Sequence, residues 1–104
     1  MRWIPVKRRI YQAMEKAMQQ IRDRIDSIDS EILVLLKERL GCAGEIGLIK
    51  KNQELAVCDP AREKQILDRL SKDNNGVFPE KALRTIFQEI ITTCRLSQSQ
   101  EDSQ

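Results

Sequence analysis

The sequence of 104 residues contains no histidine and only three cysteines, Cys42, Cys58 and Cys94, which lie far apart without a CxxC pair. Zinc sites need clustered thiolates and imidazoles, so a site of that type is excluded, and we expect neither a metal nor a cofactor. The lack of histidine also removes the usual catalytic triads and the commonest general base near neutral pH. Any catalysis therefore depends on Arg, Lys, Glu, Asp and Gln side chains.

Aromatic residues make up only 4% of the chain, and three prolines and four glycines leave few turn signals. These shortages argue against a β-sandwich or a barrel. Apolar residues are plentiful at 40% and regularly spaced, which argues against disorder. No apolar run reaches the roughly 18–20 residues that span a bilayer, and no secretory signal is present, so we expect no membrane contact. Unclustered cysteines suit a reducing compartment, and we expect a cytoplasmic protein.

Basic residues are concentrated at the start of the chain. Residues 1–20 carry five basic side chains and only one acidic side chain, Glu15, whereas the whole chain has 18 and 16. A basic arm of this kind can touch nucleic acid or a membrane surface. A solvated extension is the commoner explanation, and we favour it over a nucleic-acid partner.

Apolar residues from Ile21 onward recur at intervals of three and four, which predicts one long helix between about Gln19 and Gln53. At 1.5 Å per residue it would be about 50 Å long, more than the width of a globule of this size. Two further helices in the same chain cannot cover its apolar stripe, so we expect a dimer whose long helices pack together. The small residues that would permit this close approach are Gly41, Ala43, Gly44 and Gly47.

A second, short helix has a clear start and a clear end. Asp59 is placed as the N-cap and Pro60 as the first helical residue, with Glu63 near the positive end of the helix. The sequence Asp73–Gly76 ends it, because such clusters favour turns.

Pro79 opens a third helix of medium length, whose apolar residues run to Cys94. Residues 97–104 are polar, and we expect them to be disordered. Before the long helix, the residues after Pro5 are expected to form a helical extension. The predicted fold is all-α, with a long, a short and a medium helix in each protomer.

Several cations lie on faces that should be apolar. Arg39 and Lys50 are eleven residues apart, close to three helical turns, so they project from the same side of the long helix. Arg22 lies about 100° away from Arg39 around that helix and would reach such a site only from the partner in an antiparallel dimer. Taken singly, these residues are explained as solvated surface charges. Taken together, they suit a pocket between helices for a compact, multiply anionic molecule.

Three stretches resemble the all-helical chorismate mutases. Arg22–Leu33, which begins as RxxIDxID, and then Leu35–Arg39, Ile46, Gly47 and Lys50 are similar to the first helix of that family. Val57–Glu63, with its DPxRE motif, resembles the start of the second helix. Ile86–Ile91, followed by Cys94 and Gln98, is similar to the last helix. The resemblance covers roughly residues 20–98.

The resemblance implies a chorismate mutase domain at residues 20–98, between a basic extension at residues 1–19 and a polar tail at residues 99–104. It implies an intertwined homodimer with two equivalent active sites. The implied reaction is the [3,3]-sigmatropic rearrangement of chorismate to prephenate, in phenylalanine and tyrosine biosynthesis. A pericyclic shift transfers no proton and forms no covalent intermediate, which agrees with the missing histidine. The chain would be either a stand-alone enzyme or the mutase domain of a bifunctional prephenate dehydratase-type protein.

The family's functional positions carry over residue by residue. The resemblance implies that Arg39, together with Arg22 of the partner subunit, binds the two substrate carboxylates. Lys50 is expected to contact a carboxylate and the ether oxygen, and Gln98 to donate its amide to the same oxygen from the opposite side. A glutamate at this last position would have to be protonated to donate, whereas Gln98 donates at any pH, so we expect activity that does not need acidic conditions.

The resemblance also implies that Glu63 accepts a hydrogen bond from the ring hydroxyl, with the Asp59 backbone close to that hydroxyl. Arg62 is expected to line the site or to support Glu63. Cys94 departs from the pattern, because a serine often binds a carboxylate there and a thiol is a weaker donor. The carboxylate contact at this position therefore depends on whether the Cys94 thiol can replace the serine hydroxyl.

Two alternatives share these features. An isochorismate pyruvate-lyase, which gives salicylate, uses nearly the same cations on the same scaffold, although Glu63 and the DPxRE motif favour the mutase. A non-catalytic helical dimer with a regulatory role would not need Arg39, Lys50 or Gln98, and all three are present.

Overall fold

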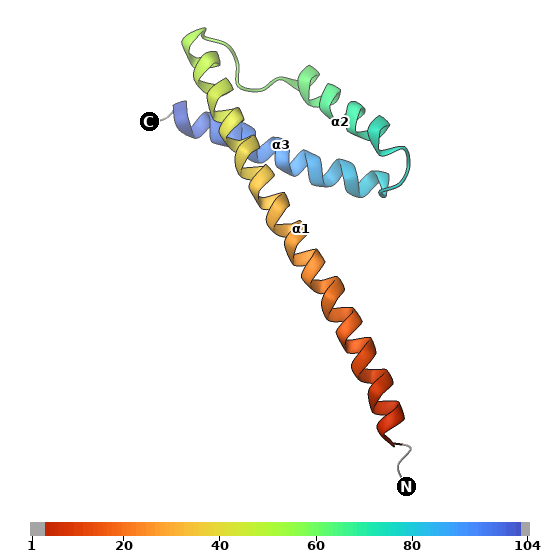
Figure 1. Cartoon of the computed structure of the whole chain (residues 1–104). Helices are drawn as coiled ribbons and strands as arrows, with labels where there is room; N and C mark the ends of the chain where they lie inside the picture. The colour runs from red at the N-terminus through yellow and green to blue at the C-terminus, as the bar shows by residue number, and fades with distance from the viewer. Residues whose placement is uncertain (1–3, 103–104) are drawn as a thin grey trace. The chain divides into compact units, whose positions relative to one another are not determined.

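The computed structural model describes residues 4–102, which form three helices and no strand (Figure 1). These are α1 (Ile4–Asn52), α2 (Pro60–Asn74) and α3 (Glu80–Asp102). The chain divides into two compact units, Met1–Leu35 and Leu36–Gln104. The first contains the amino-terminal part of α1, and the second contains the rest of α1 with α2 and α3. The predicted order of a long, a short and a medium helix is confirmed, and none of these helices is long and apolar enough to cross a membrane.

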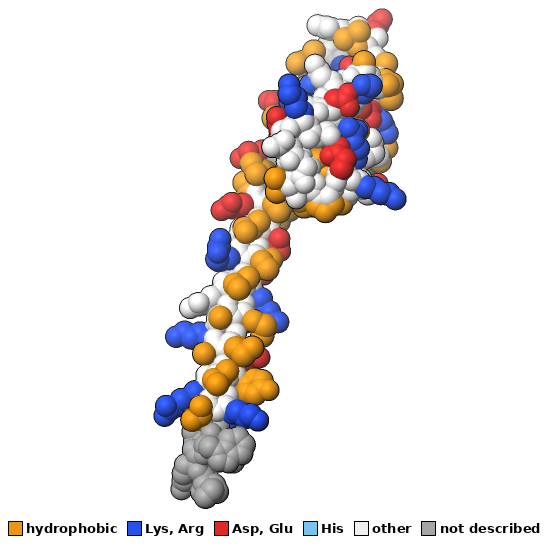
Figure 2. All heavy atoms as spheres, turned by 90° about the vertical axis from the view of Figure 1, so that its right-hand side faces the viewer, with side chains coloured by type: hydrophobic (Ala, Val, Ile, Leu, Met, Phe, Trp, Pro, Cys, Tyr) orange, Lys and Arg blue, Asp and Glu red, His pale blue; other side chains and the backbone are white. Residues whose placement is uncertain are grey.

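In the first unit, apolar side chains follow α1 at intervals of three or four residues, and each is about half exposed. Figure 2 shows such side chains along this part of α1, with basic side chains beside them. We call this set the apolar stripe; its members are Val6, Ile10, Met14, Met18, Ile21, Ile25, Ile28 and Ile32. The helix already includes residues 5–19, which confirms that the extension is helical.

The carboxyl end of α1 is closed by a left-handed residue. Glu54 has a φ of 57°, and its backbone N–H donates to the carbonyl of Lys51 at 3.2 Å. The N–H of Leu55 donates to the carbonyl of Lys50 at 2.7 Å, which completes a Schellman motif. The Lys50 Nζ then donates to the carbonyl of Val57 at 3.0 Å and so holds the following loop against α1.

The start of α2 matches the sequence-based prediction. Asp59 is the N-cap, and its Oδ1 accepts a hydrogen bond from the Arg62 N–H at 3.1 Å, with Pro60 in the first turn. This capping presents the side chains of the first turn in a fixed direction. The helix ends at Asn74, and Asn75 follows in the left-handed conformation with a φ of 49°.

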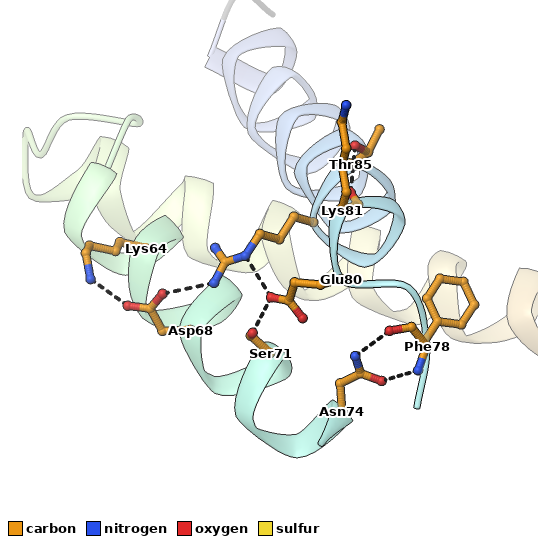
Figure 3. A network of polar contacts seen from close by, with 9 residues as sticks. Lys64, Asp68, Ser71, Asn74, Phe78, Glu80, Lys81 and Thr85 are labelled. Atoms are coloured by element: carbon orange, nitrogen blue, oxygen red, sulfur yellow. Dashed lines mark hydrogen bonds and ion pairs between the residues drawn. The ribbon is translucent and has the colours of Figure 1, made fainter. Parts of the chain in front are cut away.

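α2 packs against α3, which returns beside it after a short turn (Figure 1). In that turn the Asn74 side chain accepts from the Phe78 N–H and donates to the Phe78 carbonyl, both at 2.7 Å (Figure 3). One side chain thus satisfies both backbone groups of the residue that precedes Pro79 and α3.

Charged side chains join α2 to the start of α3 (Figure 3). Asp68 pairs with Lys64 at 2.6 Å and with Arg84 at 3.5 Å, and the hydrogen bond from Lys64 lowers the pKa of Asp68 from its ordinary value of 3.8. Glu80 accepts hydrogen bonds from Ser71 and from Arg84, of which the one from Ser71 lowers its pKa most. The hydrogen bond to Glu80, followed by the one to Asp68, raises the pKa of Arg84. These pairs are solvent-exposed, so each contributes modestly to stability.

The core of the second unit lies where its three helices meet. Its buried apolar side chains are Ala43, Ile66, Ile91 and Cys94. Gly47 allows α1 to approach α3 there, since a Cβ at Gly47 would lie 3.1 Å from the Cβ and Cγ of Gln98. A Cβ at Gly41 would meet nothing within 4 Å in this chain. The predicted close approach at Gly47 is therefore to α3 of the same chain, and the prediction that it serves the long helices of a dimer is corrected there.

The expected disorder of the polar tail is wrong for the residues that the structure describes. α3 continues through Ser97 to Asp102, and residues 103–104 lie outside the described part. Residues 97–102 contain neither proline nor glycine, so nothing in the backbone ends the helix when its apolar face ends.

Candidate functional site

A pocket of about 250 Å³ opens in the second unit, with walls from α1, the loop before α2, α2 and α3. Its apolar wall includes Ile46, Ile66 and Ile91. The structure brings together seven of the eight predicted site residues around it: Arg39, Lys50, Asp59, Arg62, Glu63, Cys94 and Gln98. The eighth, Arg22, lies exposed on α1 in the first unit, so its role in the site of a partner stays a prediction.

α1 contributes two half-buried cations, Arg39 and Lys50, whose predicted common side is confirmed by their place on one pocket. The Lys50 ammonium gives one of its three donors to the carbonyl of Val57. Arg39 makes no hydrogen bond or ion pair with any residue of the described range 4–102. Its guanidinium, with five N–H donors, is therefore available to an anionic ligand.

The first turn of α2 brings Asp59, Arg62 and Glu63 to the pocket. The Asp59 carboxylate caps α2 by accepting a hydrogen bond from the Arg62 N–H. The backbone carbonyl of Asp59 accepts a hydrogen bond from the Glu63 N–H at 3.0 Å. The Arg62 Nη1 donates to Gln65 Oε1 at 2.7 Å, along the exposed side of α2. Of the two roles expected for Arg62, lining the pocket is observed, and its guanidinium pairs with Gln65 rather than with Glu63.

The partners of Glu63 come from α3 instead. Arg95 Nη1 lies 2.7 Å from Glu63 Oε2, and Gln88 Nε2 donates to Glu63 Oε1 at 3.3 Å. Arg95 also lines the pocket, whereas neither Arg95 nor Gln88 was expected from the sequence to take part. The available signal was their spacing of seven residues, which places both on one face of a helix.

Cys94 and Gln98, one turn apart on α3, form the buried end of the pocket, with exposed fractions of 6% and 8%. The Gln98 Oε1 is buried without a hydrogen-bond partner. A buried amide that the protein leaves unpaired costs free energy unless something else pairs with it. The Gln98 side chain thus lies close to the backbone of α1 at Gly47, lines the pocket and has an Oε1 without a hydrogen-bond partner among residues 4–102.

Four cationic side chains and two carboxylates line the pocket, so its lining has a net charge of +2. The cations are Arg39, Lys50, Arg62 and Arg95, and the carboxylates are Asp59 and Glu63. Such a balance favours a small ligand with two negative charges. No cluster of three or more acidic, cysteine or histidine side chains that could hold a metal ion occurs among residues 4–102.

Comparison with known proteins identifies the family of the chain. The family model described as chorismate mutase type II matches residues 21–99. The chain belongs to this family, and its all-helical fold is the one expected for a member. Among solved structures, the chorismate mutase (form II) from Thermus thermophilus is similar, with a TM-score of 0.76 and 34% identity over 79% of this chain and 93% of that chain.

Relatives that are similar in sequence include a bifunctional protein and a chorismate mutase. A bifunctional chorismate mutase/prephenate dehydratase from Aquifex aeolicus is 42% identical over 81 residues, which cover 74% of this chain and 22% of the relative. A chorismate mutase from Methanocaldococcus jannaschii is 41% identical over 59 residues, covering 57% of this chain and 60% of that protein. The chain thus spans about a fifth of the length of its bifunctional relatives.

Proposed function

We propose that this chain catalyses the rearrangement of chorismate to prephenate. The observation that carries the proposal is the gathering of Arg39, Lys50, Glu63 and Gln98 around one pocket with an excess of two positive charges. Chorismate is a dicarboxylate with an ether bond and a ring hydroxyl, so each of these side chains has a complementary group. Membership of the chorismate mutase type II family supports the same substrate.

The roles follow from the chemistry of the side chains. Arg39 binds a substrate carboxylate through its uncommitted guanidinium. Lys50 keeps two donors beyond the one given to Val57, and these serve a carboxylate and the ether oxygen. Gln98 donates its amide to the ether oxygen, on which negative charge develops as the C–O bond breaks. Fixed donors aimed at that oxygen and a pocket that holds the folded conformer together lower the barrier.

The active form is proposed to be an intertwined homodimer. The apolar stripe supports this, because its side chains are about half exposed in the single chain and repeat as in helices that pack along their length. Arg22 of the partner subunit then completes the charge around the second carboxylate. The three unclustered cysteines are consistent with a reducing cytoplasm as the compartment.

The test is a proton NMR time course of the purified chain with chorismate and, separately, with isochorismate. Prephenate that accumulates from chorismate supports the proposal, provided that a Lys50→Ala chain prepared in the same way is nearly inactive. Salicylate and pyruvate formed from isochorismate alone would favour the lyase. No turnover of either compound by a folded chain would favour a non-catalytic module.

A further inference from the structure

We propose that Arg95, assisted by Gln88, is a positioning residue that holds the Glu63 carboxylate for the substrate hydroxyl. The proposal rests on the proposed function, since it assigns a task to the surroundings of Glu63. It starts from an ion pair between two helices whose members are 32 residues apart in sequence.

Each oxygen of Glu63 receives its own donor from α3. Arg95 Nη1 lies 2.7 Å from Oε2, and Gln88 Nε2 lies 3.3 Å from Oε1. The Glu63 side chain is only 19% exposed and that of Arg95 is 31% exposed, so the pair is shielded from water more than the charged pairs of the α2–α3 turn. Two donors on separate oxygens fix both the position and the plane of a carboxylate.

The donors are themselves held in place. Gln88 Nε2 also lies 3.3 Å from Thr92 Oγ1, one turn further along α3. Arg95 Nη1 lies 3.9 Å from the sulfur of Cys58, in the loop before α2. Arg95 therefore connects α3 with both the loop and the first turn of α2, which carry one wall of the pocket.

This arrangement has two consequences for a ligand. A carboxylate has about four acceptor positions, and two donors leave Glu63 free to accept one more hydrogen bond, from a hydroxyl. Without the guanidinium, the Glu63 charge would face a dianionic ligand unbalanced and its side chain would sample several rotamers. Arg95 thus offsets the repulsion between the Glu63 carboxylate and an anionic ligand in the pocket.

A double-mutant cycle with Arg95→Met and Glu63→Gln tests the proposal, with kcat and KM for chorismate measured beside thermal unfolding. Arg95→Met should lower kcat/KM roughly 10- to 100-fold, and should lower it less than about twofold further in the Glu63→Gln background. Arg95→Lys, which keeps the charge but not the planar fork, should recover part of the loss. Arg69→Met is the matched control, because Arg69 forms an exposed pair with Asp73 on the surface of α2 and should leave both constants unchanged.

The possible outcomes separate the two proposals. A wild-type chain without mutase activity rejects the proposed function, and this role with it. An active wild type whose two losses multiply in the double variant rejects only the positioning role, because Arg95 would then act on the substrate directly. Unchanged kinetic constants for Arg95→Met would also overturn it. If Arg95→Met does not fold, the cycle of Gln88→Leu with Glu63→Gln decides in the same way, with a smaller loss expected that disappears in the Glu63→Gln background.

Discussion

Replacing Gly47 by alanine tests the close approach of α1 to α3 at Gln98. The added Cβ would lie 3.1 Å from the Cβ and Cγ of Gln98 and 3.3 Å from its Cα. The Cα belongs to the backbone of α3, so a rotation of the Gln98 side chain cannot relieve the whole overlap. α1 and α3 must therefore separate by a few tenths of an ångström at the end of the pocket.

Two opposing terms set the size of the effect. Overpacking of a well-filled site costs about 1–3 kcal/mol. Alanine in place of glycine inside a helix gains about 1 kcal/mol. The net change for Gly47→Ala is a loss of about 0–2 kcal/mol. Gly41→Ala has the same helix gain without the overlap, so it should be more stable than wild type by up to about 1 kcal/mol.

The assay compares the two variants by urea unfolding at one fixed chain concentration and by chorismate turnover. The difference in unfolding free energy isolates the overlap, because the helix term is common to both. Gly47→Ala should also lower kcat roughly 10- to 100-fold, since a small displacement of Gln98 moves a donor from its place. Equal stability and activity of the two variants would refute the described contact. A loss of stability in Gly41→Ala would instead indicate a partner helix against Gly41, as the sequence predicted.

Three further predictions concern the pocket, the dimer and the α2–α3 turn. Lys50→Ala should lower kcat by two or more orders of magnitude, since a donor of this kind contributes roughly 3–4 kcal/mol in the transition state, and stopped-assay kinetics measure it. Arg22→Ala and Arg39→Ala chains should each be nearly inactive, and mixing them should restore one intact site per heterodimer; mixtures that stay inactive contradict a shared site. The pKa values of Asp68 and Glu80 are lowered in the fold, so their contribution to stability is present at neutral pH and is lost as the pH falls below about 4. Thermal unfolding followed by circular dichroism from about pH 6 down to about pH 3 should show that fall, and an Asp68→Asn, Glu80→Gln double variant should reduce it.

The features that could be predicted from sequence are the ones governed by neighbouring residues. The start of α2 depends on Asp59 and Pro60 alone, and the common side of Arg39 and Lys50 depends only on helical spacing. The polarity of the tail predicted disorder from Ser97 onward. α3 nevertheless continues to Asp102, because glutamine and glutamate are good helix formers although they are polar.

The missed features depend on residues far apart in the chain. Arg95 was overlooked because its partner, Glu63, lies on another helix, and the sequence offered Arg62 as a nearer cation. In the same way, Gly47 was assigned to a contact between two chains, although α3 of its own chain provides the neighbour. Local sequence patterns predict the individual helices, whereas the packing of one helix against another determines which charged side chains form pairs.

The apolar stripe has a consequence for the order of events in folding. A helix with half-exposed isoleucines gains little from burial on its own, and helices outside a packed environment are only marginally stable in water. If the chain forms the proposed homodimer, order in residues 4–35 should therefore arise when two chains meet rather than before. We expect refolding of this helix after dilution from denaturant to accelerate with chain concentration, whereas the α2–α3 pair, closed by its own turn, forms at a rate that does not depend on it.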